Sequence, residues 1–150
     1  MNSDFSDLLK LMGEFQVRFL VIGGYAVIRY TEPRYTKDLD LWIEPTSENA
    51  DRCFRALAAF GAPLVGLGPL DFTQQGYVYQ MGIPPTRVDI LMSLSGLPFP
   101  EAYARRVEIE FDGLRIPILS KEDLITSKLA AGRPQDLMDV ESLRQSPPDE

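Results

Sequence analysis

The chain has 150 residues, 45% of them hydrophobic, and a formal net charge of −7. This length suits one domain with a substantial core, since about 68–70% of the unfolded surface is buried at this size. The chain has no histidine and one cysteine, which excludes histidine-dependent triads, zinc fingers and an internal disulfide. Any bound metal must therefore take oxygen ligands, as Mg²⁺, Mn²⁺ and Ca²⁺ do. The negative charge argues against tight, non-specific nucleic-acid binding, and no apolar run reaches the ~20 residues of a membrane span.

The predicted elements alternate between helices and strands. Amphipathic spacing predicts helices at 4–15, 25–30, 47–60, 121–131 and 134–143, with a short helical stretch ending near 103. Short apolar runs predict strands at 17–22, 37–44, 77–83, 87–92, 107–111 and 114–119. Asp112-Gly113 is typical of a hairpin turn, and Ser120 and Gly132 are suited to begin and end a helix. Residues 64–76 are expected to form an irregular loop.

These elements predict a single domain over residues 1–143, followed by a flexible tail over 144–150. The N-terminus lacks the basic start of a secretion signal, and one cysteine fits a reducing compartment, so a cytoplasmic location is expected. Cys53 lies in a helical pattern and is expected to be a buried small hydrophobe.

Two aspartates one residue apart are the most informative feature. Asp38 and Asp40 alternate with Leu39, Leu41 and Ile43, so a strand would place both carboxylates on one face, about 7 Å apart. Such a pair suits a divalent cation. The alternative is a solvated edge strand with outward charges.

A third aspartate repeats this pattern on a later strand. Asp89 lies between Val88 and Ile90, which point to the opposite face. If this strand lies beside the strand of Asp38 and Asp40, three carboxylates converge and raise one another's pKa values unless a cation binds them. The alternative is one polar residue on an exposed face.

A glycine pair ends the first apolar strand. Gly23 and Gly24 precede a short helix, and glycines at a helix start let backbone N–H groups approach phosphate oxygens. The alternative is an ordinary turn from strand to helix.

Together these motifs resemble the nucleotidyltransferase (DNA polymerase beta-like) superfamily. The pattern is a glycine pair, a spacer of thirteen residues, the Asp-Leu-Asp motif and an aspartate on a later strand. Segments 21–27 (VIGGYAV) and 33–40 (PRYTKDLD) resemble minimal bacterial nucleotidyltransferases related to the toxins of abortive-infection toxin–antitoxin systems. Segment 128–139 (KLAAGRPQDLMD) resembles the last motif of that group. The similarity spans roughly residues 17–143.

The resemblance implies a nucleotidyltransferase fold of the α/β (α+β) class, a mixed twisted β-sheet with helices packed against it. It also implies metal-dependent transfer of a nucleoside monophosphate from a nucleoside triphosphate (NTP) to an acceptor hydroxyl, with release of pyrophosphate. Asp38, Asp40 and Asp89 would be catalytic and would bind Mg²⁺ or Mn²⁺.

Further residues follow from the same resemblance. Those implied to bind the nucleotide phosphates are Gly23, Gly24, Arg34, Lys37 and Lys128. The secondary candidates are Thr36, Arg133 and Asp136. Other interpretations stay open: Lys128 as a solvated helix lysine, Asp136 as a partner of its own helix dipole, and Arg133 as an ion-pair partner of Asp136. Related sequences often carry a histidine where this chain has Tyr30.

The sequence leaves the acceptor open between RNA, protein and a small molecule. The resemblance also includes a toxin-like role with an antitoxin or partner subunit, and assembly as a homo-oligomer is part of the same expectation. Tyr25, Tyr77 and Tyr79 are candidates to stack on a base, although packing is the commoner role of such tyrosines. Two alternatives are a catalytically silent nucleotide-binding or antitoxin-like subunit with the same fold, and a metal-binding protein that takes no nucleotide.

Overall fold

The computed structural model describes residues 3–32, 38–83 and 86–146, so Arg34, Thr36 and Lys37 lie outside the described residues. The helices are α1 (Ser3–Glu14), α2 (Gly23–Tyr30), α3 (Ser47–Phe60), the 3₁₀ helix η1 (Pro69–Thr73), α4 (Phe99–Ala104), α5 (Lys121–Ala131) and α6 (Pro134–Gln145). The strands are β1 (Phe19–Ile22), β2 (Leu39–Ile43), β3 (Val78–Met81), β4 (Val88–Leu91), β5 (Val107–Phe111) and β6 (Leu114–Ile118).

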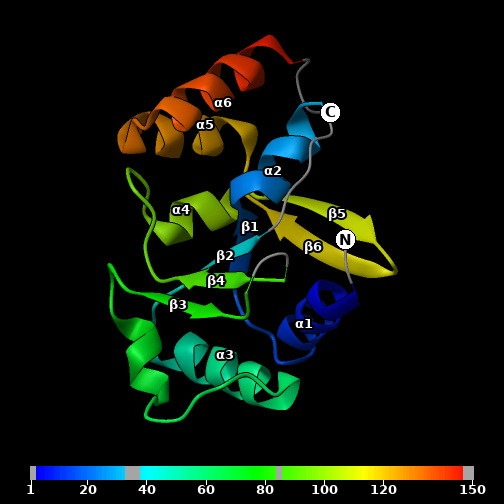
Figure 1. Cartoon of the computed structure of the whole chain (residues 1–150), viewed down its shortest axis with the longest axis vertical. Coiled ribbons are helices and arrows are strands. Elements are labelled where there is room, and N and C mark those ends of the chain that lie inside the picture. The colour runs from blue at the N-terminus through cyan, green and yellow to red at the C-terminus, as the bar shows by residue number, and fades with distance from the viewer. Residues whose placement is uncertain (1–2, 33–37, 84–85, 147–150) are drawn as a thin grey trace.

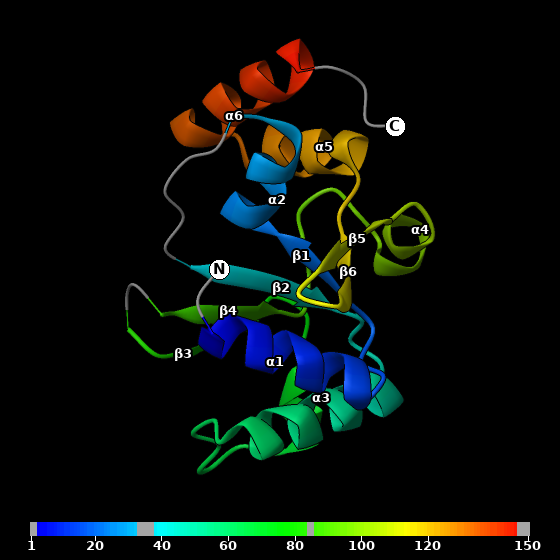
Figure 2. The same ribbon diagram turned by 90° about the vertical axis from the view of Figure 1, so that its right-hand side faces the viewer.

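The strands form one mixed sheet in the order β3-β4-β2-β1-β6-β5. The β2–β4 and β1–β6 pairs are parallel, while β1–β2, β3–β4 and β5–β6 are antiparallel. Helices α1 and α3 lie on one side of this sheet, and α2, α4, α5 and α6 lie on the other (Figures 1 and 2). The predicted mixed sheet with packed helices is therefore confirmed.

The core lies on both sides of the central strands, which explains their near-continuous apolar sequence. All four residues of β1 are buried, and Leu39, Leu41 and Ile43 of β2 are fully buried. Helix α1 adds an apolar stripe at helical spacing: Phe5, Leu8, Leu9 and Met12. Cys53 is buried as predicted, and burial raises the pKa of its thiol to about 12.

The predicted helix boundaries are confirmed at two sites. The Ser120 hydroxyl accepts a hydrogen bond from the Asp123 N–H at the start of α5, and Gly132 ends that helix in the left-handed conformation.

Three segments differ from the sequence-based expectation. Helix α2 begins at Gly23, so the glycine pair forms its first turn. The expected loop 64–76 contains η1, because Pro69 fixes the backbone, Asp71 accepts a hydrogen bond from the Gly68 N–H, and Phe72 is buried. Helix α6 continues to Gln145, into the segment expected to be a tail.

Two contacts hold α5 above the sheet. Arg105, which follows α4, donates two hydrogen bonds of 2.9 Å to the buried Asp123 of α5. Gly96 approaches α5 so closely that a Cβ there would lie 3.1 Å from the Ala130 Cβ. The position of α5 is therefore fixed by both an ion pair and a close backbone approach.

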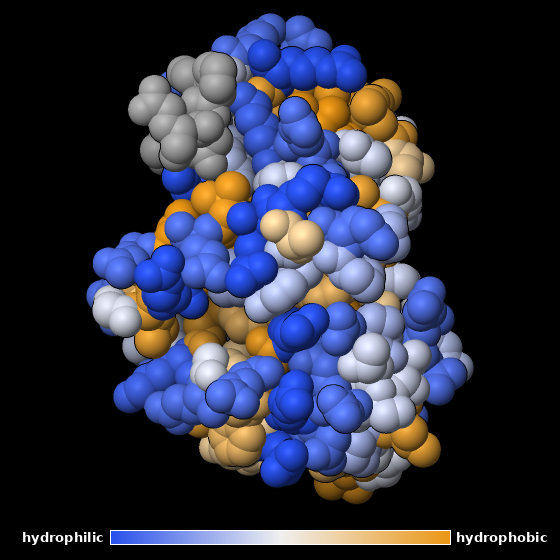
Figure 3. All heavy atoms as spheres, turned by 180° about the vertical axis from the view of Figure 1, so that it is seen from behind, coloured by the Kyte–Doolittle hydropathy of each residue, from blue (hydrophilic) through white to orange (hydrophobic). Residues whose placement is uncertain are grey.

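The rear surface is mostly hydrophilic, with apolar atoms in several places, including the top, where the C-terminal helices lie (Figure 3). Leu129, Leu137 and Met138 of α5 and α6 are among the exposed large hydrophobic residues. Within the described residues, no helix is long and apolar enough to cross a membrane.

Candidate active site

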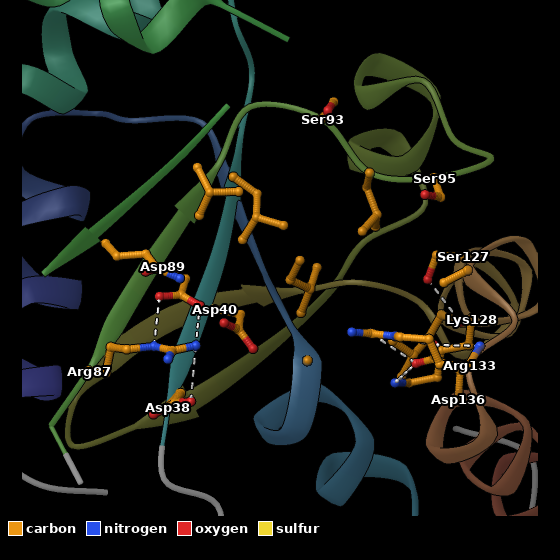
Figure 4. Close-up of a pocket in the computed structure, with 18 residues that line it drawn as sticks. Asp38, Asp40, Arg87, Asp89, Ser93, Ser95, Ser127, Lys128, Arg133 and Asp136 are labelled. Atoms are coloured by element: carbon orange, nitrogen blue, oxygen red, sulfur yellow. Dashed lines mark hydrogen bonds and ion pairs between the residues drawn. The ribbon is translucent and has the colours of Figure 1, made fainter. Parts of the chain in front are cut away.

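Three aspartates meet where β2 and β4 lie side by side. The parallel register places Asp40 directly opposite Asp89, and Asp38 precedes β2 on the same face as Asp40. Since cross-strand partners share a face, the side chains of Asp40 and Asp89 emerge together (Figure 4). The strand adjacency required for the three carboxylates to converge is thus present.

Arg87 sits among these carboxylates, and sequence analysis did not identify it. Its guanidinium donates hydrogen bonds of 3.1 and 3.0 Å to the two oxygens of Asp89, and its Nη2 lies 3.5 Å from Asp38 Oδ2. The spacing of Arg87 two residues before Asp89 was the available signal, because it places both side chains on one strand face. Arg87 is thus a built-in counter-ion for two of the three aspartates.

Asp40 is the aspartate most perturbed by this setting. Burial, first of all, and then the charges of Asp89 and Asp38 raise the pKa of Asp40 to about 7, while Arg87 acts in the opposite direction. Asp38 Oδ1 is buried and has no hydrogen-bond partner among the described residues. Asp40 is thus short of compensating positive charge, and Asp38, beside its contact with Arg87, keeps one oxygen without a partner among the residues that the structure describes. The oxygen donors therefore fit a divalent cation such as Mg²⁺ or Mn²⁺.

As they stand, no three acidic or cysteine side chains of the described part of the chain are arranged to hold one metal ion. The Arg87 guanidinium is hydrogen-bonded to Asp89 and also lies 3.5 Å from Asp38. A metal ion would have to replace this arginine at the carboxylates. The predicted metal ligands Asp38, Asp40 and Asp89 therefore remain a prediction.

Gly23 has a steric role beside the aspartates. It adopts a φ of +69°, and a Cβ at this position would overlap the carboxylate of Asp40. Only glycine allows the start of α2 to approach Asp40 so closely. Gly24 follows within the first turn of α2, and only Gly23 of the pair lines the adjoining cavity.

A cavity of about 520 Å³ separates the aspartates from α5 and α6. We call it the aspartate cavity, and its volume falls within the ~300–1,000 Å³ range of small-molecule sites. The described residues that line it on the sheet side include Asp38, Asp40, Gln80, Arg87, Asp89 and Leu91; those on the helix side include Leu124, Ser127, Lys128, Ala131, Arg133 and Asp136.

The far wall of the aspartate cavity contains two cationic side chains that are paired with two buried aspartates. Lys128 Nζ lies 3.0 Å from Asp139 Oδ2 and 3.5 Å from Asp136 Oδ1, and its side chain is only 12% exposed. Arg133 donates a 2.7 Å hydrogen bond to Asp136, and this bond is the main reason that the pKa of Asp136 is lowered. Lys128 is therefore not a solvated helix lysine, whereas the expected Arg133–Asp136 ion pair is confirmed.

The structure adds polar lining residues that sequence analysis missed. Gln80 of β3 lies opposite Asp89 in the β3–β4 register, and Ser93, Ser95 and Ser127 also line the aspartate cavity. A glutamine and three serines carry no motif, so only the strand order, the loop after β4 and the position of α5 reveal them.

The candidate base-stacking tyrosines lie elsewhere. Tyr25 packs edge-on against Phe5, Tyr79 packs against Phe72, and Tyr77 is 61% exposed. None of the three is among the residues that line the aspartate cavity. Tyr30 is buried and donates a hydrogen bond to the Leu119 carbonyl.

Comparison with known proteins identifies the family. Residues 3–145 match the profile of a family described as nucleotidyltransferases of unknown function (DUF6036). The chain belongs to this family. The resemblance stated from the sequence and the assignment as an enzyme of the nucleotidyltransferase class are therefore confirmed.

Solved structures support the fold of this DUF6036 nucleotidyltransferase. The lincosamide antibiotic adenylyltransferase LnuA, bound to lincomycin, has 15% identity and a TM-score of 0.56, over 97% of each chain. TM1012 from Thermotoga maritima, named as a candidate nucleotidyltransferase, has 18% identity and a TM-score of 0.62, over 94% of this chain and 88% of its own. A comparison with curated protein sequences finds no match.

Proposed function

We propose that this DUF6036 protein transfers a nucleoside monophosphate from an NTP to an acceptor hydroxyl and releases pyrophosphate. The observation that carries the proposal is the direct pairing of Asp40 with Asp89 across β2 and β4, facing a cavity whose far wall presents Lys128 and Arg133, which are paired with buried aspartates. Carboxylates on one wall and cations on the other suit a metal-bound triphosphate.

The two walls of the aspartate cavity would have different roles in the reaction. Lys128 and Arg133 would bind the phosphate oxygens, and Gly23 would leave the start of α2 open to them. Asp89 would orient the acceptor hydroxyl and accept its proton as the hydroxyl oxygen bonds to the α-phosphorus. The bond from the α-phosphorus to the bridging oxygen would break, and pyrophosphate would leave with the electron pair.

Asp38, Asp40 and Asp89 are the residues that would hold Mg²⁺ or Mn²⁺ in this proposal. When bound, the ion supplies charge neutralisation for the attacking and leaving oxygens. The unpartnered Asp38 Oδ1 and the raised pKa of Asp40 support this assignment because a cation would relieve both. Arg87 would then release the carboxylates and become available to the phosphates.

LnuA is named for transferring an adenylyl group to a lincosamide antibiotic, which illustrates a small-molecule acceptor on this fold. If the acceptor is RNA or protein, the proposal becomes a toxin-like role that involves an antitoxin or partner subunit.

A second candidate function is a catalytically silent nucleotide-binding subunit. The contacts of Arg87 with Asp89 and Asp38 favour it, since a permanent counter-ion would exclude the metal. The two candidates differ in turnover: the silent subunit binds NTP but releases no pyrophosphate.

Thermal unfolding with Mg²⁺ or Mn²⁺ and each of the four NTPs tests the proposed site. We expect metal and one NTP together to raise the wild-type midpoint by several degrees, since a ligand at about 100 times its Kd adds about 2.7 kcal/mol. The Asp40→Asn variant should show no such rise over its own baseline. No rise in the wild type with any pair would contradict the proposed site.

A further inference from the structure

A second cavity, of about 400 Å³, continues along the same face of the sheet, and we call it the Trp42 cavity. Trp42 follows Asp40 by two residues on β2, and Glu44 follows Trp42 by two, so the carboxylates, the indole and a further carboxylate succeed one another on one face. Ser93 lines both cavities. The full lining is Trp42, Glu44, Pro45, Thr46, Gln75, Met92, Ser93, Leu97, Pro98, Phe99 and Pro100.

The Trp42 indole shows an unmet hydrogen-bond donor in this cavity wall. The side chain is 1% exposed, and its Nε1–H has no hydrogen-bond partner among the described residues. Its ring packs edge-on against Phe99 at 5.0 Å. Because a buried N–H without a partner is unfavourable, a ligand that offers an acceptor atom beside this aromatic pair would be stabilising.

The Trp42 cavity differs in its charged lining from the aspartate cavity, whose far wall includes Lys128 and Arg133. Glu44 is the charged residue in the lining, and its side chain is 16% exposed; Arg18, which is not a lining residue, lies 3.7 Å from its carboxylate and offsets part of its charge. No cationic side chain is among the described lining residues. The remaining lining is largely apolar, with three prolines. A phosphate is thus disfavoured here, whereas an uncharged or cationic molecule with an apolar body is favoured.

We propose that the Trp42 cavity binds the acceptor, and that the acceptor is a small, uncharged or cationic amphipathic molecule with a free hydroxyl. Its body packs against Trp42 and Phe99, and its hydroxyl extends past Ser93 towards Asp89. The hydroxyl oxygen bonds to the α-phosphorus, its proton passes to the Asp89 carboxylate, and the NTP loses pyrophosphate. This inference rests on the proposed function.

The position of Trp42 provides a direct binding assay, because it is the single tryptophan of the chain. Three probes share a phenylpropyl body: cationic 2-amino-3-phenylpropan-1-ol, neutral 3-phenylpropan-1-ol and anionic 3-phenyllactate. We expect the cationic and neutral alcohols to change Trp42 fluorescence saturably in metal-free protein. The affinity of the anionic probe should be lower by at least about tenfold, because Glu44 repels it.

Matched variants locate the binding. Gln75→Phe fills the cavity mouth and should abolish the fluorescence change, whereas Gln74→Phe, at the neighbouring exposed residue outside the lining, should leave it intact. Glu44→Gln should remove the preference for the cationic over the neutral alcohol. The assignment is overturned if neither alcohol gives a saturable change, if 3-phenyllactate binds equally well, or if Gln74→Phe and Gln75→Phe behave alike.

Parallel measurements separate this inference from the proposed function. If metal with NTP stabilises the protein but the alcohols do not bind, the acceptor assignment fails and the transferase site stands. If the alcohols bind but no NTP stabilises the protein, the proposed function fails and the inference fails with it. If Gln75→Phe weakens NTP binding, the cavity holds the base, which overturns the acceptor assignment.

Discussion

A buried carboxylate destabilises a folded protein when it ionises, and Asp40 is placed to show this effect. Its pKa is about 7 in the folded protein against an ordinary value of 3.8, so the folded state keeps a proton that the unfolded state releases. The free energy of unfolding therefore falls as pH rises through this window.

We predict that metal-free wild type is less stable at about pH 8 than at about pH 5, and that Asp40→Asn removes most of this difference. At the higher pH the variant should exceed wild type by about 1–4 kcal/mol, since the neutral amide carries no buried charge. Urea unfolding with a chelator present measures both proteins. A variant less stable than wild type at the higher pH would refute this explanation.

Arg87 competes with a metal ion for the same oxygens. We predict that Arg87→Gln lowers the metal-free free energy of unfolding, because two carboxylates lose their counter-ion. Mg²⁺ should then raise the unfolding midpoint of this variant more than that of wild type. Arg52→Gln, which breaks an exposed pair with Glu48 at 3.9 Å, is the control that should change neither quantity. An equal Mg²⁺ effect in all three proteins would refute the competition.

Helices α5 and α6 form one wall through Lys128 and the buried acids beneath it. Lys128→Ala should lower the free energy of unfolding by about 3–5 kcal/mol, because it leaves Asp136 and Asp139 with less compensation. Adding Asp139→Asn to this variant should restore part of the stability but none of the NTP-dependent stabilisation. If the double variant also regains the NTP effect, Lys128 does not bind phosphate.

Elements with strong local signals were predictable, and their assembly was less so. The α5 caps at Ser120 and Gly132 and the hairpin at Asp112-Gly113 follow from residues near in sequence. The pairing of β2 with β4 joins segments almost fifty residues apart, so the sequence supplied the carboxylates and only the fold brought them together. The contact of Arg87 with Asp38 also depends on this pairing, whereas its bonds to Asp89 follow from a spacing of two residues that the sequence does contain.

Across the whole molecule the net charge is −7, and the two cations of the far wall of the aspartate cavity, Lys128 and Arg133, are paired with the buried Asp136 and Asp139. These cations are therefore held in place locally by ion pairs. This distribution suits a small triphosphate better than a long polyanion.

Transfer of labelled phosphate tests the central claim most directly. Wild type and Asp89→Asn would be incubated with Mg²⁺, α-³²P-labelled NTPs and a cell extract separated into small-molecule, RNA and protein fractions. We predict that wild type labels one fraction and releases pyrophosphate. The rate of Asp89→Asn should be lower by at least about 10²-fold. Wild type that labels no fraction, or does so no faster than Asp89→Asn, would contradict nucleotidyl transfer by these aspartates.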